Sequence, residues 1–260
     1  AMVGVFEKGK ADVKFTARSN GGHASTPVKG TPIARLSAFV NEVETHSPFR
    51  KKMLPEVPAL RSLHASASSV SPYAGFGMKL VFGNLWLFGP LLKAVMPSLS
   101  AQAGAMLKTT IAFTVQKGSD AYNVLPQEAY VGANMRFIPH QGEKESLEII
   151  KKVADKYGLE TEVLHANDYT PPVDIHGEAF HLVEQTIADT FPGLPSSPYV
   201  MTGATDAQFY QPICKSCIRF APVIYGPEQM KGMHGLNENI EYNCLPGAVR
   251  FYKNLIRAEK

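Results

Sequence analysis

The sequence predicts a mixed α/β fold, in which a ferredoxin-like sandwich is joined to part of a second α/β layer. Residues 11–164 read as strand, helix, strand, strand, helix and strand, which is the order of the split βαβ sandwich. From residue 178 onward, helices alternate with short strands, a pattern that favours a parallel α/β layer. Hydrophobic residues make up 45% of the 260 residues, so the chain can form one large domain or two ordinary ones.

The elements of the sandwich are predicted from the spacing of their apolar residues. Val13, Phe15 and Ala17 alternate with polar residues, as in a half-buried strand. Leu36 and Val40 fall on one face of a helix, as in an amphipathic helix. The predicted elements are strands at 2–6, 11–17, 109–116, 128–137 and 159–164, and helices at 31–45 and 144–157.

A long insertion, residues 47–108, separates the first helix from the second strand of the sandwich. Its apolar stretch, residues 80–96, is interrupted by glycine, proline and polar residues. It is also shorter than the roughly 20 residues that a membrane span requires. We therefore expect a buried helix or an interface segment here, and no membrane span.

The last third of the chain is predicted to follow a linker at residues 168–173. It contains too few strands to close a doubly wound sheet by itself. The predicted elements are a helix at 178–190, strands at 199–202 and 217–221, and a final helix at 247–257.

Charge and composition exclude several classes of partner. The net charge is only +3, and the basic residues are scattered, so a nucleic-acid partner is not expected. An RNA-binding sandwich would also need aromatic strands of the RNP type, which the sequence lacks. No signal peptide opens the sequence, so a cytoplasmic location is expected.

The three cysteines are too few, and odd in number, for a disulfide framework. Cys214 and Cys217 have C-x-x-C spacing, but there is no second pair to complete a four-ligand zinc site. A redox dithiol would want a thioredoxin-like context, which the sequence does not provide. Ordinary semi-buried thiols are therefore the simpler interpretation.

Three polar side chains in the sandwich are candidates for a functional site. His23 lies in GGHASTP, between a strand and a helix, where two glycines allow a sharp turn. Asn123 lies in a loop that enters a strand, and Arg136 lies on the face of that strand opposite its apolar residues. Taken singly, each also fits an ordinary role: a solvated histidine, a turn cap or a surface ion pair.

Two further candidates lie in the last third of the chain. Gly203 and Thr205 fall in a turn between a strand and a helix-like run, where free backbone N–H groups can bind an oxyanion or a carboxylate. His234 lies in a polar loop, MHGLNEN. Thr205 could equally be a helix cap, and His234 an ordinary loop residue.

Five motifs, GGHASTP, NVLP, NMR, TGATDAQFY and HGLNENI, occur together in this order. In this the chain resembles the di-zinc peptidases of metallopeptidase family twenty, which includes aminoacylase, succinyl-diaminopimelate desuccinylase and carboxypeptidase S. NLWLFGPLL and TTIAFTVQKGSDAYNVLP are most similar to the branch that contains carboxypeptidase S and the secreted N-fatty-acyl-amino-acid hydrolase. The resemblance extends over essentially the whole chain.

The resemblance implies a zinc-peptidase α/β catalytic domain interrupted by a ferredoxin-like lid that commonly mediates dimerisation. The lid would be residues 10–167. Residues 1–9 would form the last catalytic-domain strand before it, and residues 168–260 the closing part of the catalytic domain. We therefore expect a homodimer formed through the lid.

The chemistry that the resemblance implies is hydrolysis of an amide bond in a peptide or N-acyl amino acid with a free carboxylate. In the family, two zinc ions activate a bridging water and a glutamate takes its proton. His23 matches the lid histidine that hydrogen-bonds the oxyanion, often across the dimer, and His234 matches a zinc ligand. The matches to the family's substrate-binding positions are Asn123, Arg136, Gly203 and Thr205.

Other features of the sequence depart from the family's pattern. It contains no H-x-D motif and no Glu-Glu pair, so His234 is the one match to a family metal ligand. We therefore expect the C-terminal part of an enzyme, inactive by itself; the alternative is a non-catalytic binding or dimerisation module. Gln208 replaces a basic residue frequent in relatives, and Ala204 a glycine. The apolar insertion around Trp86 suggests an acyl pocket, or equally core or dimer packing.

Overall fold

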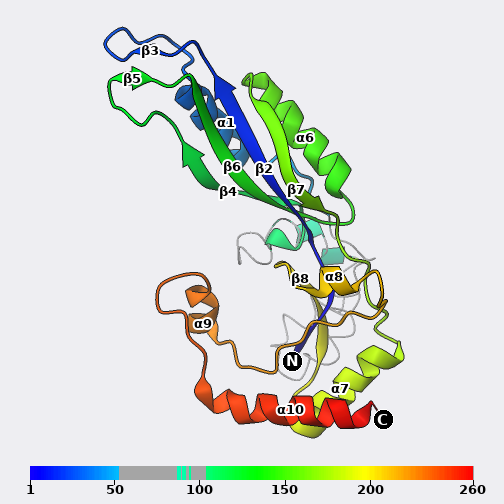
Figure 1. The fold of residues 1–260 in the computed structure, drawn as a ribbon. Helices are drawn as coiled ribbons and strands as arrows, with labels where there is room; N and C mark the ends of the chain where they lie inside the picture. Colours follow the sequence, from blue (N-terminus) through cyan, green and yellow to red (C-terminus); the bar gives the residue numbers. More distant parts are fainter. Residues whose placement is uncertain (53–86, 89, 92–93, 95–103, 260) are drawn as a thin grey trace.

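The computed structural model describes residues 1–52, 87–88, 90–91, 94 and 104–259. A four-stranded antiparallel sheet forms the upper part of the molecule, with strand order β4-β6-β2-β7 (Figure 1). This is the strand order of a ferredoxin-like sandwich, so the predicted fold class is confirmed. The strands are β2 (Gly9–Arg18), β4 (Thr110–Lys117), β6 (Glu128–Phe137) and β7 (Glu160–Asn167).

Two helices cover one face of this sheet, α1 (Pro32–Thr45) and α6 (Glu143–Lys156) (Figure 1). Helix α1 begins where the Thr31 side chain accepts a hydrogen bond from the backbone N–H of Ala34. Helix α6 ends before Gly158, whose φ of +61° is the left-handed conformation that favours glycine after a helix. Apolar residues of both helices pack against the alternating apolar residues of β2 and β6.

A short two-stranded arm extends from one end of the sandwich (Figure 1). It pairs β3 (Gly22–His23) with β5 (Val124–Leu125) in antiparallel register. The sequence predicted two separate loops here, and that prediction was wrong. Two residues are too few to show an alternating pattern, and the pairing joins segments about 100 positions apart.

The lower part contains a two-stranded parallel sheet, formed by β1 (Met2–Glu7) and β8 (Ser197–Met201). Helix α7 (Glu178–Thr190) packs with helix α10 (Leu245–Ala258). Their shared core comprises Val3, Val5, Val173, Phe180, Val183, Ile187 and Phe251. Short helical segments complete the described elements: α8 (Ala207–Tyr210), α9 (Pro227–Gly232) and the 3-10 turn η1 (Tyr242–Cys244).

The strand predicted at residues 217–221 is not formed. Arg219 makes a single antiparallel bridge with Gly4, in which the two N–H···O distances are 2.7 and 2.9 Å. Pro222 follows closely and cannot donate a ladder hydrogen bond, which explains why the pairing does not extend.

The two parts of the molecule are joined where two chain segments pass closely at Gly9. A Cβ atom at Gly9 would lie 2.7 Å from the backbone oxygen of Asn167 and 2.7 Å from the nitrogen of Tyr169. Only glycine allows this approach. The predictions for residues 80–96 and for Trp86 lie largely outside the described residues. Within the described ranges, no helix combines the length and apolar character needed to cross a bilayer.

Candidate functional site

His23 is exposed on the two-stranded arm, and Ser25 holds its ring. The Ser25 hydroxyl lies 2.7 Å from Nδ1, and the Ser25 backbone N–H donates to Nδ1 at 3.2 Å. Because that N–H can only donate, Nδ1 must be an acceptor, and the neutral ring then carries its proton on Nε2. The local structure therefore presents Nε2–H as the hydrogen-bond donor of the imidazole.

Asn123 lies beside His23, although 100 positions separate them in the sequence. The Asn123 carbonyl accepts a hydrogen bond from the backbone N–H of Ala24 at 2.9 Å, and His23 pairs with Val124. The structure thus brings these two predicted site residues together on one arm.

Arg136 lies on β6, on the sheet face opposite the core, as predicted from the alternation of the strand. Its Nε donates to Asn134 Oδ1 at 2.9 Å, and Asn134 in turn donates to Asp12 at 2.6 Å. The buried Nη1 has no hydrogen-bond partner among the described residues. Burial lowers the pKa of the Arg136 guanidinium, whereas the nearby carboxylates of Asp12 and Glu7 raise it. One end of the guanidinium is therefore oriented by the protein, while Nη1 keeps unused donors.

Thr205 is bound to a buried carboxylate. Glu7 accepts from the Thr205 backbone N–H at 2.7 Å and from its hydroxyl at 2.6 Å. Glu7 also forms an ion pair with Arg219, whose Nε lies 3.1 Å from Glu7 Oε2; both side chains are under 5% exposed. The Arg219 guanidinium reaches Cys217 O at 2.6 Å and Thr170 Oγ1 at 3.1 Å. We call Glu7, Thr170, Thr205 and Arg219 the buried polar network.

Lys8 is the next residue after Glu7 in the sequence, and it is buried at the junction of the two parts. Its Nζ donates to the carbonyl oxygens of Ala105 and Lys108, each at 2.9 Å. Burial, followed by repulsion from Arg136 and Lys108, lowers the pKa of Lys8 to about 7. Glu7, Lys8 and Arg136 thus form a charged region where the sandwich meets the lower part of the molecule, and Thr205 is bound to it through Glu7.

Gly203 and His234 lie on loops of the lower part. A Cβ atom at Gly203 would meet nothing within 4 Å, so this turn is open. His234 is exposed and has a φ of +57°, and its backbone N–H donates to Glu238 at 3.2 Å. Helix α9, which precedes His234, lies in the lower part of the molecule, whereas the arm with His23 extends from the upper part (Figure 1). A single chain does not bring these two histidines together.

The potential metal ligands among these residues are widely separated. In the described part of the chain, no three His, Cys, Asp or Glu side chains lie close enough together to hold a metal ion. A catalytic zinc needs about three protein ligands. These residues therefore do not form a complete zinc site by themselves.

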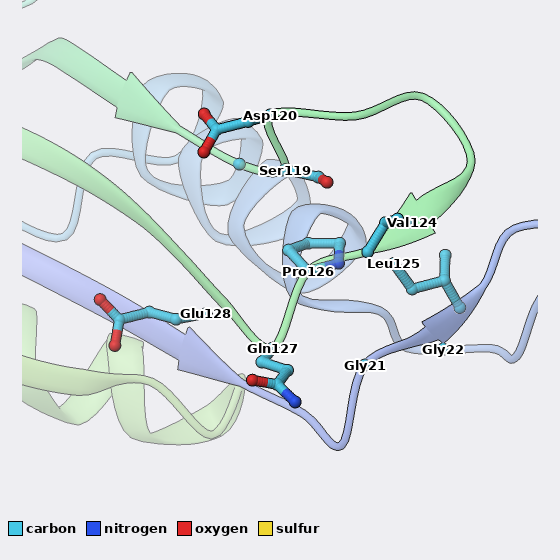
Figure 2. Close-up of a pocket in the computed structure, with 10 residues that line it drawn as sticks. Gly21, Gly22, Ser119, Asp120, Val124, Leu125, Pro126, Gln127 and Glu128 are labelled. Carbon is cyan, nitrogen blue, oxygen red and sulfur yellow. The ribbon is translucent and has the colours of Figure 1, made fainter.

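A hollow of about 320 Å³ lies beside the base of the two-stranded arm. Figure 2 shows Gly21 and Leu125 on one side of it, with Asp120 and Glu128 contributing carboxylates. None of the predicted site residues lines it. The hollow therefore borders the backbone next to His23, at Gly22 and Val124, but its lining does not include the residues of the charged junction.

Sequence reasoning missed Glu7, Lys8, Thr170 and Arg219. Glu7 and Lys8 end an apolar strand, where charged residues are usually solvated, so nothing marked them as buried. Arg219 did carry a signal, because it interrupts the apolar run between Ile218 and Phe220.

Comparison with known proteins places these features in a family. Residues 7–258 match the family described as Peptidase family M20/M25/M40. Over 259 residues the chain is 32% identical to the N-fatty-acyl-amino acid synthase/hydrolase PM20D1 of Xenopus tropicalis, covering 99% of this chain and 49% of that protein. Over 258 residues it is 26% identical to the probable carboxypeptidase S-like 2 of Dictyostelium discoideum, covering 99% and 48%. The chain thus spans about half the length of these relatives.

A solved structure shows the same fold. The di-peptidase Dug1p of Saccharomyces cerevisiae aligns with a TM-score of 0.67 at 13% identity, covering 100% of this chain and 56% of that chain. The family match extends over nearly the whole chain and agrees with the resemblance drawn from the five motifs. The chain therefore belongs to peptidase family M20/M25/M40.

Proposed function

We propose that this chain forms part of a zinc-dependent hydrolase that cleaves the amide bond of peptides or N-acyl amino acids with a free carboxylate. The observation that carries the proposal is the match over 99% of the chain to relatives named as a carboxypeptidase and as an N-fatty-acyl-amino acid synthase/hydrolase. We further propose that residues 10–167 are the lid and dimerisation domain, and that residues 1–9 and 168–260 belong to the catalytic domain.

In this proposal His23 donates a hydrogen bond to the oxyanion that forms when the amide carbonyl is attacked. The inferred Nε2–H donor and the exposed position of the arm support this role. A preorganised donor of this kind contributes about 3–4 kcal/mol to transition-state stabilisation. Within one chain His23 lies on the arm of the upper part and His234 on a loop of the lower part, so we propose that a second chain supplies His23 in a homodimer formed through the lid.

The substrate carboxylate is proposed to bind Arg136 and the Gly203–Thr205 turn of one chain. Asn123 lies beside His23 on the arm, so we propose that it reaches the same carboxylate from the second chain. The free donors on Arg136 Nη1 support this assignment, because a buried guanidinium nitrogen without a partner is unfavourable until an acceptor arrives. Thr205 is positioned by Glu7, so its backbone is oriented before any substrate binds.

We propose His234 as one zinc ligand, with the remaining ligands supplied by protein outside the described residues. The sequence offers no H-x-D motif and no Glu-Glu pair for this purpose. By this proposal the isolated chain does not retain zinc tightly and has no hydrolytic activity.

The test compares the isolated chain with a longer gene product that contains it, assayed on N-acyl amino acids with added zinc. We expect activity in the longer protein alone. His23→Gln should lower its kcat by about 10²–10³-fold, from the loss of one oxyanion donor, and His46→Gln serves as an exposed control. Tight zinc binding and hydrolysis by the isolated chain would contradict the proposed division of ligands. An inactive longer protein that still dimerises through this chain would favour the alternative, a binding or dimerisation module.

A further inference from the structure

The Cys214–Cys217 pair has a structural setting that its sequence spacing did not reveal. Cys214 is exposed and Cys217 is buried. The Cys217 thiol donates to the Cys214 carbonyl oxygen at 3.3 Å, so the chain turns back between the two residues. Burial raises the pKa of the Cys217 thiol, and the nearby Cys214 thiol raises it further. The two side chains are therefore neighbours, one open to solvent and one shielded.

The backbone of Cys217 is also tied to the buried polar network. Its carbonyl oxygen accepts from Arg219 Nη1 at 2.6 Å, and the same guanidinium binds Glu7 Oε2 through Nε at 3.1 Å. Glu7 in turn holds the backbone N–H and the hydroxyl of Thr205. Two side chains, those of Arg219 and Glu7, thus connect the Cys217 backbone to Thr205.

We propose that Cys214 and Cys217 are a redox-active dithiol that a low-molecular-weight disulfide oxidises, and that closing the Cys214–Cys217 bond loosens the buried polar network at Thr205. Bringing two sulfurs to a bond length of about 2.05 Å with the required dihedral angle shifts the backbone of a short turn. The Cys217 carbonyl is the atom through which this shift reaches Arg219. The link to substrate binding rests on the proposed function, whereas the dithiol and its effect on Thr205 do not.

The reaction balances as two thiol–disulfide exchanges. The exposed Cys214 thiolate attacks one sulfur of the small disulfide, forming a mixed disulfide and releasing one small thiol. The Cys217 thiolate then attacks Cys214 Sγ, which forms the intrachain bond and releases the second small thiol. Two protein thiols lose two electrons, the small disulfide gains them, and the two protons leave with the released thiols.

Glutathione and glutathione disulfide at a series of ratios provide the test, with the chain alkylated and weighed at each ratio. Oxidation should remove two of the three alkylatable thiols together, and peptide mapping should join Cys214 to Cys217. Cys244, which is buried elsewhere and hydrogen-bonded to the Glu241 carbonyl at 2.8 Å, should stay reduced. Cys217→Ser should stop at a glutathione adduct on Cys214, and Cys244→Ser should behave as the wild-type chain.

Hydrogen exchange at the Thr205 amide tests the second half of the proposal. Weakening one hydrogen bond worth about 1 kcal/mol should speed its exchange about fivefold in the oxidised chain. Cys214→Ser, at an exposed position, should show the same exchange with and without glutathione disulfide. Retention of all three alkylatable thiols at every ratio would overturn the proposal. So would an intrachain bond that leaves Thr205 exchange unchanged. Neither readout depends on hydrolytic activity, so failure here is distinct from failure of the proposed function.

Discussion

Replacing Glu7 by glutamine should strongly destabilise the fold, because it leaves the charge of Arg219 buried without a carboxylate. The Glu7 and Arg219 side chains are only 3% and 4% exposed. Glutamine can still accept from the Thr205 N–H through Oε1. Its amide NH₂, however, would replace Oε2 and face Arg219 Nε, so two donors would meet where an ion pair was. Removing one partner of a buried ion pair typically costs about 3–5 kcal/mol.

A matched control is available on the surface. Arg18 pairs with Glu160 at 3.0 Å, but these side chains are 58% and 63% exposed. Water screens such a pair, and its loss typically costs less than about 1 kcal/mol. Glu160→Gln therefore makes the same chemical change in a solvated setting.

The assay is urea unfolding at pH 7, followed by circular dichroism, for the wild-type chain, Glu7→Gln and Glu160→Gln. The double variant Glu7→Gln/Arg219→Met completes a mutant cycle with Arg219→Met. We expect the double variant to be more stable than the sum of the single losses predicts, because neither charge remains buried alone. A Glu7→Gln loss no larger than that of Glu160→Gln would refute the reasoning that burial makes this ion pair important.

Three further predictions concern the junction and the core. Lys8→Met should abolish a rise in wild-type stability between about pH 7 and 10.5, because the folded protein lowers the Lys8 pKa from 10.5 to about 7. In that window the unfolded chain binds more protons, so wild-type stability increases with pH by about 5 kcal/mol in all, measurable by urea melts. Gly9→Ala should lower the melting temperature, since its Cβ would meet backbone atoms at 2.7 Å, whereas Gly203→Ala, with open space around it, should not. Phe39→Ala should cost about 3–5 kcal/mol of unfolding free energy, because Phe39 is fully buried against Phe15 at a ring distance of 4.7 Å; a loss under 1 kcal/mol would contradict this packing.

The long elements of the sandwich could be predicted from the sequence. The alternation in residues 128–137 predicted both β6 and the face on which Arg136 lies, and Gly158 follows the end of α6 as expected. Such elements bury one face, so their apolar spacing follows the geometry of the backbone. The five motifs predicted family membership, which the comparison confirmed.

Other features were decided only by the tertiary structure, because they depend on contacts between residues that are distant in the sequence. The pairing that places His23 beside Asn123 involves strands of two residues, too short to leave a pattern. The burial of Glu7 and Lys8 follows from segments that pack over the end of β1, and the hydrogen bonds that satisfy these charges come from residues about 100 to 200 positions away. Local sequence records the periodicity of a strand, whereas the burial of a charge depends on which partner the fold brings to it.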